Sequence, residues 1–279
     1  MPELPEVEVV RAGLDGFLPG RTVLGVRVLH PRSVRRHPGG SAAFEATVNG
    51  RTFGNPRRRG KYLWLPFTDG DALIAHLGMS GQFLVAGART AHTRVEFDLT
   101  DGVLRFADQR TFGGLWLSPG GAAGPAEIAH IAPDVFEADL PALARRIHTM
   151  PRGIKRVLLD QGVVSGIGNI YADEALWRAR THYAANAAAL PVQRILAVLT
   201  AARDVMTESL AQGGTSFDAL YVHTDGEAGY FERSLAVYGR AGQPCQHCGR
   251  PIVREPFMGR SSFRCPRCQR LPAGKVGTL

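Results

Sequence analysis

All four cysteines of this chain lie within its last 35 residues, and their spacing limits what that end can fold into. They form two Cys-x-x-Cys pairs, Cys245/Cys248 and Cys265/Cys268, with sixteen residues between the pairs. Each pair can present two thiolates to one ion, so two pairs complete a tetrahedron with no position left for water. We therefore predict a zinc ribbon that holds one structural Zn²⁺. Two disulfides are the alternative, and they would need an oxidising compartment.

The hydrophobic pattern before this module changes part-way along the chain. The first 20 residues predict a helix whose apolar side follows helical spacing and which stops at Pro19-Gly20. From about residue 22 to residue 117, short apolar runs alternate with turn residues, and Asp69-Gly70 and Asp101-Gly102 are typical hairpin turns. The pattern predicts an N-terminal helix with an antiparallel β-sandwich.

Residues 118–126, SPGGAAGPA, have the composition of a linker, and the pattern after them is helical. Helices are expected at residues 139–148, 153–161, 170–180 and 191–212. We therefore expect an α+β fold in three domains, which are residues 1–120 (β-sandwich), 127–236 (helical) and 237–271 (zinc ribbon hairpin).

The chain is strongly basic, with a formal net charge of +8 and a pI near 9.8. This charge favours an anionic partner, above all a nucleic acid. No apolar run reaches membrane-spanning length, and the start of the chain, MPELPEVEVV, lacks the basic and apolar regions of a signal peptide. We expect a cytoplasmic protein that does not associate with membranes.

The N-terminus itself can act as a reagent. Removal of Met1, which precedes a small residue, would leave Pro2 with a free secondary amine. An α-amino group has a pKa near ~8, so a sizeable fraction is unprotonated at neutral pH. Such an amine can attack a carbonyl-level carbon and form an iminium, and Glu3 and Glu6 are close enough in sequence to move protons. The alternative is an ordinary helix start, with Pro5 in the first turn.

Seven segments, in order along the chain, resemble formamidopyrimidine-DNA glycosylase, a family of base-excision repair enzymes. They are MPELPEVEVVRAGL (1–14), NPRRRGKY (55–62), HLGMSG (76–81), DQRTFGG (108–114), LLDQGVVSGIGNIYADEALW (158–177), QGGTSF (212–217) and GYFERSLAVYGR (229–240). The resemblance covers nearly the whole chain and includes the zinc module. It implies a monomer of the bacterial cytoplasm and nucleoid, with a helix–two-turns–helix fold in the helical domain.

The resemblance also implies the activity, which is excision of 8-oxoguanine and formamidopyrimidines from double-stranded DNA and then β,δ-elimination at the abasic site. Pro2 matches the nucleophile that attacks the anomeric carbon, and Glu3 matches the carboxylate that helps to protonate and open the sugar ring. Glu6 matches a second active-site carboxylate, and Lys61 matches a lysine beside the lesion that contacts phosphate.

Further residues match DNA contacts of the family, namely His92, Arg110, Lys155, Asn169 and Arg260. Lys155 corresponds to a lysine used in handling 8-oxoguanine, and a solvent-facing helix lysine is its alternative. Asn169 matches a phosphate ligand in the turn before a helix, and Arg260 matches the hairpin arginine that clamps the phosphates beside the lesion.

Base flipping leaves a gap in the duplex that must be filled. The family fills it with three side chains, to which Met79, Arg110 and Phe112 correspond. Arg110 would also bond the orphaned cytosine. Out of this context, Met79 and Phe112 would be core residues. Residues 214–230 match a loop that caps the lesion.

One position departs from the family, since Thr111 stands where many members carry a second arginine. We expect this to alter affinity and to leave the chemistry intact. Two other functions remain open. An endonuclease VIII-like enzyme for oxidised pyrimidines usually has Gly where this chain has Leu4, and a non-catalytic damaged-DNA-binding protein would be expected to lose Pro2 and Glu3.

Overall fold

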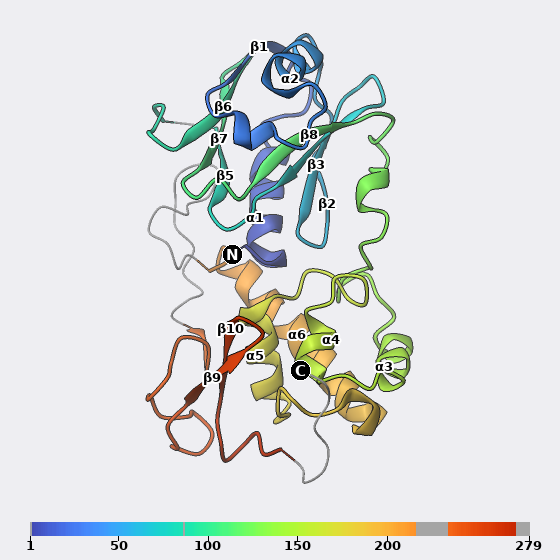
Figure 1. Cartoon of the computed structure of the whole chain (residues 1–279), viewed down its shortest axis with the longest axis vertical. Helices are drawn as coiled ribbons and strands as arrows, with labels where there is room; N and C mark the ends of the chain where they lie inside the picture. Colours follow the sequence, from blue (N-terminus) through green and yellow to red (C-terminus); the bar gives the residue numbers. More distant parts are fainter. Residues whose placement is uncertain (1, 86, 216–233, 272–279) are drawn as a thin grey trace. The chain divides into compact units, whose positions relative to one another are not determined.

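The computed structural model describes residues 2–85, 87–215 and 234–271, and the chain forms two compact units (Figure 1). Unit 1 comprises Met1–His130 and Gln212–Glu232, and unit 2 comprises Ile131–Ala211 and Arg233–Leu279. The zinc module therefore belongs to the same compact unit as the helices that precede it. Among the described residues, no helix is both long enough and apolar enough to cross a membrane.

Unit 1 is built on two four-stranded antiparallel sheets, which confirms the predicted fold class. The first sheet has the order β1-β6-β7-β5, and its strands are Val23–Val28 (β1), Thr93–Leu99 (β6), Val103–Asp108 (β7) and Gly81–Leu84 (β5). The second has the order β2-β3-β4-β8, and its strands are Arg57–Arg59 (β2), Tyr62–Pro66 (β3), Ala72–His76 (β4) and Gly114–Ser118 (β8). Both predicted turns connect antiparallel neighbours, β3–β4 and β6–β7.

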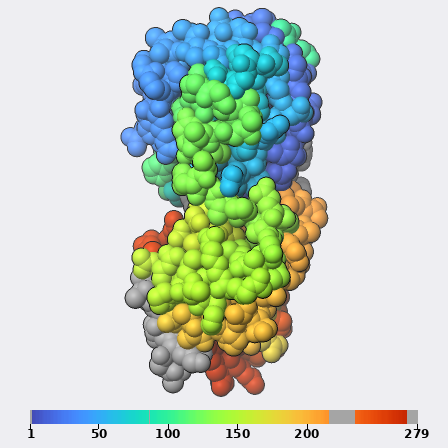
Figure 2. All heavy atoms as spheres, turned by 90° about the vertical axis from the view of Figure 1, so that its right-hand side faces the viewer, coloured from blue at the N-terminus to red at the C-terminus, as the bar shows by residue number. Residues whose placement is uncertain are grey.

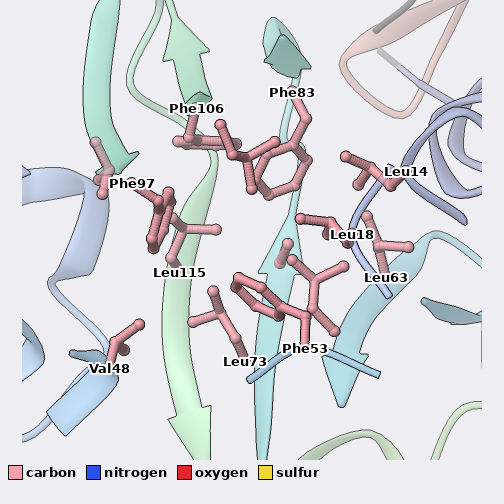
Figure 3. Packing of buried hydrophobic residues seen from close by; sticks show 14 of the residues in the cluster. Leu14, Leu18, Val48, Phe53, Leu63, Leu73, Phe83, Phe97, Phe106 and Leu115 are labelled. Carbon is pink, nitrogen blue, oxygen red and sulfur yellow. The ribbon is translucent and has the colours of Figure 1, made fainter. Parts of the chain in front are cut away.

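Helix α1, Leu4–Asp15, packs its apolar side into the core between the sheets. Leu14 and Leu18 lie among aromatic side chains such as Phe53 and Phe83 (Figure 3). The helix ends at Asp15, four residues before the predicted stop at Pro19. The amide of Gly16 bonds back to the carbonyl oxygen of Ala12, and the chain then turns so that Leu18 enters the core.

A second helix was not expected in unit 1. Helix α2, Gly40–Val48, lies inside the region whose pattern predicts strands, and the short 3-10 helix η1, Pro31–Val34, precedes it. Phe44 and Val48 are four residues apart and fully buried in the same core. This spacing places both side chains on one side of a helix, so the uniform strand prediction was wrong here.

The predicted linker, residues 118–126, lies against the second sheet of unit 1. The indole nitrogen of Trp64 donates to the carbonyl oxygen of Ala122 at 3.2 Å, and the amide of Ala122 donates to that of Gly70 at 3.0 Å. Figure 2 shows the green atoms of this part of the chain lying over the blue atoms of unit 1. The segment is therefore hydrogen-bonded to unit 1, despite its linker-like composition, and ends in the 3-10 helix η2, Ala126–Ile128.

Unit 2 contains four helices and a β-hairpin among its described residues. They are α3 (Leu140–His148), α4 (Ile154–Leu158), α5 (Asn169–Arg178), α6 (Val192–Ala211), β9 (Val253–Phe257) and β10 (Arg260–Arg264), with the 3-10 helix η3 (Ala187–Ala189) before α6. Asp139 caps α3 by accepting from the amide of Ala142 at 3.0 Å. The helix predicted at 153–161 ends at Leu158, and Asp160 then bonds the amide of Gly162 in a turn.

Candidate active site and DNA interface

Glu6 joins the start of α1 to the segment that follows α6. One carboxylate oxygen accepts from the amide of Glu3 at 2.8 Å, and the other accepts from the amide and hydroxyl of Thr215 at 2.9 and 2.8 Å. Gly214 has a φ of +82°, and a Cβ there would lie 3.4 Å from Glu6 Oε1. The backbone therefore approaches the carboxylate closely at a conformation that favours glycine.

Pro2 and Glu3 are both buried beside this carboxylate, which is itself only 4% exposed. Glu3 and Glu6 form a reciprocal capping box at the start of α1, so the helix fixes both acids relative to Pro2. While Met1 is attached, the nitrogen of Pro2 is an amide and has no nucleophilic lone pair. The predicted chemistry therefore requires removal of Met1.

The loops that carry the three predicted gap-filling residues are tied together by one buried carboxylate. Asp108, fully buried at the end of β7, accepts from the Ser80 hydroxyl at 2.6 Å and from the Gly113 amide at 2.7 Å. The Ser80 oxygen in turn accepts from the amide of Arg110 at 3.0 Å. A Cβ at Gly78 would lie 2.5 Å from the nitrogen of Gly113, so the two loops also touch through their backbones.

The gap-filling residues themselves are exposed on these loops. Met79 is 37% and Phe112 is 45% exposed, and the Arg110 guanidinium lies 5.6 Å from the centre of the Phe112 ring. The alternative that Met79 and Phe112 are core residues is therefore wrong. Large apolar side chains held out on a fixed loop can wedge between bases.

An arginine also holds the loop that carries Arg110 and Phe112. Arg35 donates to the carbonyl oxygens of Gly113 at 2.8 Å and Phe112 at 3.1 Å. The backbone of Thr111 has a φ of +53°, which is strained for a β-branched residue. Arg35 and Asp108 hold the two residues after Thr111, and the Ser80 oxygen holds the amide of Arg110 before it, so these bonds offset the strain.

Lys61 lies half-buried in the turn between β2 and β3, close to the half-buried ring of His76. Burial, together with the positive charges of Arg36, Lys61 and Arg35, lowers the pKa of His76 to about 4. His76 is therefore neutral at pH 7, and its ring lies 5.0 Å from that of Tyr62. His92 stands just before β6, where its carbonyl oxygen accepts from the amide of Asp108 at 2.9 Å.

In unit 2, the four cysteines form a site that fits one zinc ion. Their sulfur atoms all lie within 4.8 Å of one another, and the Sγ atoms of Cys248 and Cys265 are 3.5 Å apart. Tetrahedral Zn–S bonds of about 2.3 Å place sulfurs roughly 3.8 Å apart. All four cysteines are free thiols in the structure, so the disulfide alternative does not fit. Trp177 on α5 donates its indole N–H to Cys245 Sγ at 3.4 Å.

Two adjacent acids of α5 fasten the zinc module to the helix. Asp173 accepts from the amide of Phe263 at 2.9 Å and from the hydroxyl of Ser262 at 2.9 Å. Glu174 accepts from three successive amides, those of residues 236–238, at 2.8–2.9 Å. Burial raises the pKa of both carboxyls, and these donors oppose that shift. Both acids serve the fold of unit 2.

Lys155 has no exposed surface, which excludes the solvent-facing alternative. Its ammonium lies 2.7 Å from Asp173 Oδ1 and 3.1 Å from the hydroxyl of Ser262, and 4.8 Å from the centre of the Phe257 ring. The ammonium is therefore covered in this structure, and a DNA contact of Lys155 stays a prediction. The lysine bonds the hairpin strand β10 beside Arg260.

Asn169 is the first residue of α5, and it also reaches β10. Its Nδ2 donates to the carbonyl oxygen of Ser261 at 2.9 Å, while its Oδ1 is buried without a hydrogen-bond partner among the described residues. Arg260 is exposed at the start of β10. Lys155 and Asn169 therefore both bond the strand immediately after the predicted phosphate clamp.

Comparison with known proteins gives matches along most of the chain. Family models match the formamidopyrimidine-DNA glycosylase N-terminal domain at residues 1–115, its H2TH domain at 131–219 and a zinc finger found in FPG and IleRS at 242–271. The formamidopyrimidine-DNA glycosylase of Salinispora arenicola is 56% identical over 282 residues, 98% of this chain and 97% of that protein. The chain belongs to the formamidopyrimidine-DNA glycosylase family.

Solved structures of this family have the same fold. The MutM (Fpg) protein of Thermus thermophilus matches with a TM-score of 0.86 at 36% identity, covering 97% of this chain and all of that one. Lactococcus lactis Fpg, 30% identical, matches over 96% of this chain and all of its own. Its structure with N7-benzyl-Fapy-dG DNA has a TM-score of 0.87, and that with oxidised-pyrimidine DNA has one of 0.86.

Several supporting residues of this chain were not predicted from the sequence. Asp108 and Ser80 lie inside the quoted segments DQRTFGG and HLGMSG, and the adjacent acids Asp173 and Glu174 interrupt an otherwise apolar helix. Charged residues at buried positions of a helix are the signal that could have indicated them. Of the predicted lesion-capping loop, residues 214–230, only Gly214 and Thr215 are described, and the rest lies outside the described residues.

Proposed function

We propose that this protein is a bifunctional DNA glycosylase/AP lyase that excises 8-oxoguanine and formamidopyrimidines from double-stranded DNA. One observation supports it above the others. Glu6 fixes the buried residues Pro2 and Glu3 at the start of α1. The same unit exposes Met79, Arg110 and Phe112 on two loops that are hydrogen-bonded to each other. The chain thus combines a reagent for the sugar with side chains suited to the gap left by a flipped base.

In the proposed reaction, the freed amine of Pro2 bonds to the anomeric carbon of the damaged nucleotide as the bond from that carbon to the base breaks. The base takes up a proton and leaves. Glu3 protonates the ring oxygen, so the sugar opens and an iminium forms between Pro2 and the former anomeric carbon. Loss of a C2′ proton then expels the 3′ phosphate, and a further elimination expels the 5′ phosphate.

Glu6 takes a positioning part in this proposal. Both of its oxygens already accept hydrogen bonds, from Glu3 on one side and from Thr215 on the other. We assign it to holding the reactive start of the chain in place, and we assign proton transfer to Glu3. Lys61 and His92 are proposed to contact phosphate, together with Arg260 and the N-terminal turn of α5.

We propose a separate role for each of the three predicted domains. Residues 1–120 would carry the chemistry, residues 127–236 the helix–two-turns–helix contact with DNA, and residues 237–271 the zinc-held arginine. We also propose that the protein works as a monomer in the bacterial cytoplasm, at the nucleoid. The charge of +8 supports attraction to DNA throughout.

Borohydride trapping tests the nucleophile. Reduction of the iminium on 8-oxoguanine DNA should give a covalent adduct, and peptide mass mapping should place it on the N-terminal peptide at Pro2. Pro2→Gly should trap very little, and mass spectrometry of the unmodified protein should show Met1 removed. An adduct mapped to Lys61, or full-yield trapping by the variant, would refute the assignment.

The same trap decides between substrate classes. We expect 8-oxoguanine opposite cytosine to trap faster than 8-oxoguanine opposite adenine, because Arg110 would bond the orphaned cytosine. A duplex with thymine glycol serves as the arm for oxidised pyrimidines. Faster trapping on thymine glycol would favour an endonuclease VIII-like activity, and binding without any trapping would favour a non-catalytic damage-binding protein.

A further inference from the structure

A hollow of about 360 Å³ opens in unit 2 between α4 and the tip of the zinc hairpin. It is lined by Arg152, Arg156, Leu159, Asp160, Met258 and Arg260. Three arginines face one aspartate here, which leaves an excess of two positive charges. Of these residues, only Arg260 belongs to the set predicted to bind DNA.

Arg156 points outward because the other residues of its helix are buried. Helix α4 has five residues, and Arg156 is the one that is not buried. Neighbouring residues on a helix point about 100° apart. The side chain of Lys155 points into the core, where it meets Asp173, and that of the next residue, Arg156, therefore points outward to the hollow.

The single carboxylate of the wall is already engaged. Asp160 Oδ2 lies 3.0 Å from Nη1 of Arg152, and its Oδ1 accepts from the amide of Gly162 at 3.1 Å. Asp160 thus fixes the orientation of Arg152 and offsets one of the three positive charges. Arg156 and Arg260 are the other two cations of the wall.

The opposite wall is stiff. The hairpin tip turns through Met258 at a φ of +46° and Gly259 at +70°, and Arg260 pairs with Phe257 across the turn. The next residue, Ser261, has its carbonyl oxygen bonded by Asn169, and its hydroxyl accepts from Arg254 at 2.7 Å. Arg260 therefore projects from a backbone that is held on both sides.

The chemistry of this wall matches the sugar-phosphate backbone of DNA. Guanidinium groups fit phosphate oxygens in pairs, and Leu159 and Met258 (54% exposed) add apolar surface of the kind that a deoxyribose covers. A free inorganic phosphate would make no use of that apolar surface. We propose that the hollow binds one backbone phosphodiester of the duplex, and that Arg152 and Arg156 are DNA-binding residues alongside Arg260. This inference rests on the proposed function and adds a contact to it.

The test is duplex binding by full-length, zinc-loaded protein across a range of NaCl concentrations. Arg156→Gln should weaken binding roughly tenfold at moderate salt, equally for damaged and undamaged duplex. The slope of log K against log [salt] should fall by about one, as expected for one lost phosphate contact. Arg203→Gln, an exposed arginine of α6 outside the hollow, is the matched control and should change neither quantity.

Neutral methylphosphonate linkages, placed singly along each strand, then locate the occupant. A neutral linkage at one position should weaken DNA binding by the wild type. The same linkage should leave binding by Arg156→Gln unchanged, because the variant has already lost that contact. Arg152→Gln should show the same coupling at the same linkage, which guards against misfolding of one variant. A wild-type slope in both variants, or no coupled position on either strand, overturns the proposal. Normal borohydride trapping in that case would leave the proposed function standing.

Discussion

The two units support the side chains that we propose to contact DNA by different means. In unit 1, Met79, Arg110 and Phe112 stand on loops whose support is the buried carboxylate Asp108, and each of the three lies at the surface. In unit 2, support comes from the cysteine site and from Lys155 and Asp173 behind Arg260. Lys155, which the family resemblance marks as a DNA contact, is buried in this structure, and we propose that it supports Arg260.

Loss of the metal should break the support of unit 2 most completely. Cys265→Ser leaves three thiolates for zinc, and a small module held by metal loses its fold with the ion, since such sites contribute on the order of 10 kcal/mol. We expect zinc content and duplex affinity to fall together, the latter by about a hundredfold or more at moderate salt because Arg260 loses its strand.

Metal analysis and binding on the same sample check this. Gln246→Ala, which changes an exposed residue of the same module and no ligand, is the control. Tight duplex binding by a zinc-free variant would show that the hairpin arginines work without their support.

Lys155→Met should come next, because it leaves Asp173 buried without its cation. Removal of one partner of a buried ion pair costs about 3–5 kcal/mol. If Lys155 only supports the hairpin, the variant should unfold at a lower urea concentration. Its slope of log K for DNA binding against log [salt] should be unchanged. The double variant Lys155→Met/Asp173→Asn should recover part of the stability. A slope reduced by about one at full stability would return Lys155 to the DNA contacts.

Asp108→Asn tests the support of unit 1. The amide keeps the shape of the carboxylate but cannot accept from Ser80 and Gly113 with full charge, at a cost of about 2 kcal/mol. Trapping on 8-oxoguanine DNA should slow severalfold or more, because the loops of Arg110 and Phe112 are no longer fixed. An already abasic duplex, which needs less flipping, should be affected less. Asp101→Asn, an exposed carboxylate of the same unit, serves as the control. Equal slowing on both substrates would contradict a role in filling the gap.

The smallest effect expected is a dependence of stability on pH at His76. Its pKa is about 4 in the folded chain and 6.5 in the unfolded chain, so the unfolded state binds more protons between these values. Stability is therefore lost as the pH falls from 7 to 5, by at most about 2 kcal/mol from this group. Urea unfolding at both pH values should show a smaller loss for His76→Gln. An identical loss in the variant would show that His76 is charged in the fold.

How far the sequence predicts this molecule depends on the distance between the interacting residues. The zinc site follows from two local Cys-x-x-Cys pairs, and α1 follows from a single apolar stripe and its capping acids. The burial of Lys155 could not be predicted in this way, because its partners Asp173 and Ser262 lie 18 and 107 residues away. Ser80 and Asp108, 28 residues apart, meet only when the first sheet is formed.

Local composition also misled the prediction at two places. Residues 118–126 have the glycine and proline content of a linker, yet Trp64 and Gly70 bond them to the sheet. Helix α2 lies between strands, and its two buried side chains are too few to form a clear stripe in the sequence. In both cases contacts with distant residues outweighed the local pattern.

Trp177 gives the molecule a built-in optical probe. The chain has three tryptophans, and this is the one that lies in unit 2. Its indole donates to a zinc-ligating sulfur and stacks on the His247 ring, with the ring centres 4.2 Å apart. A change in the metal site therefore alters the surroundings of this indole directly, and its emission can follow zinc uptake and release in real time without any attached dye.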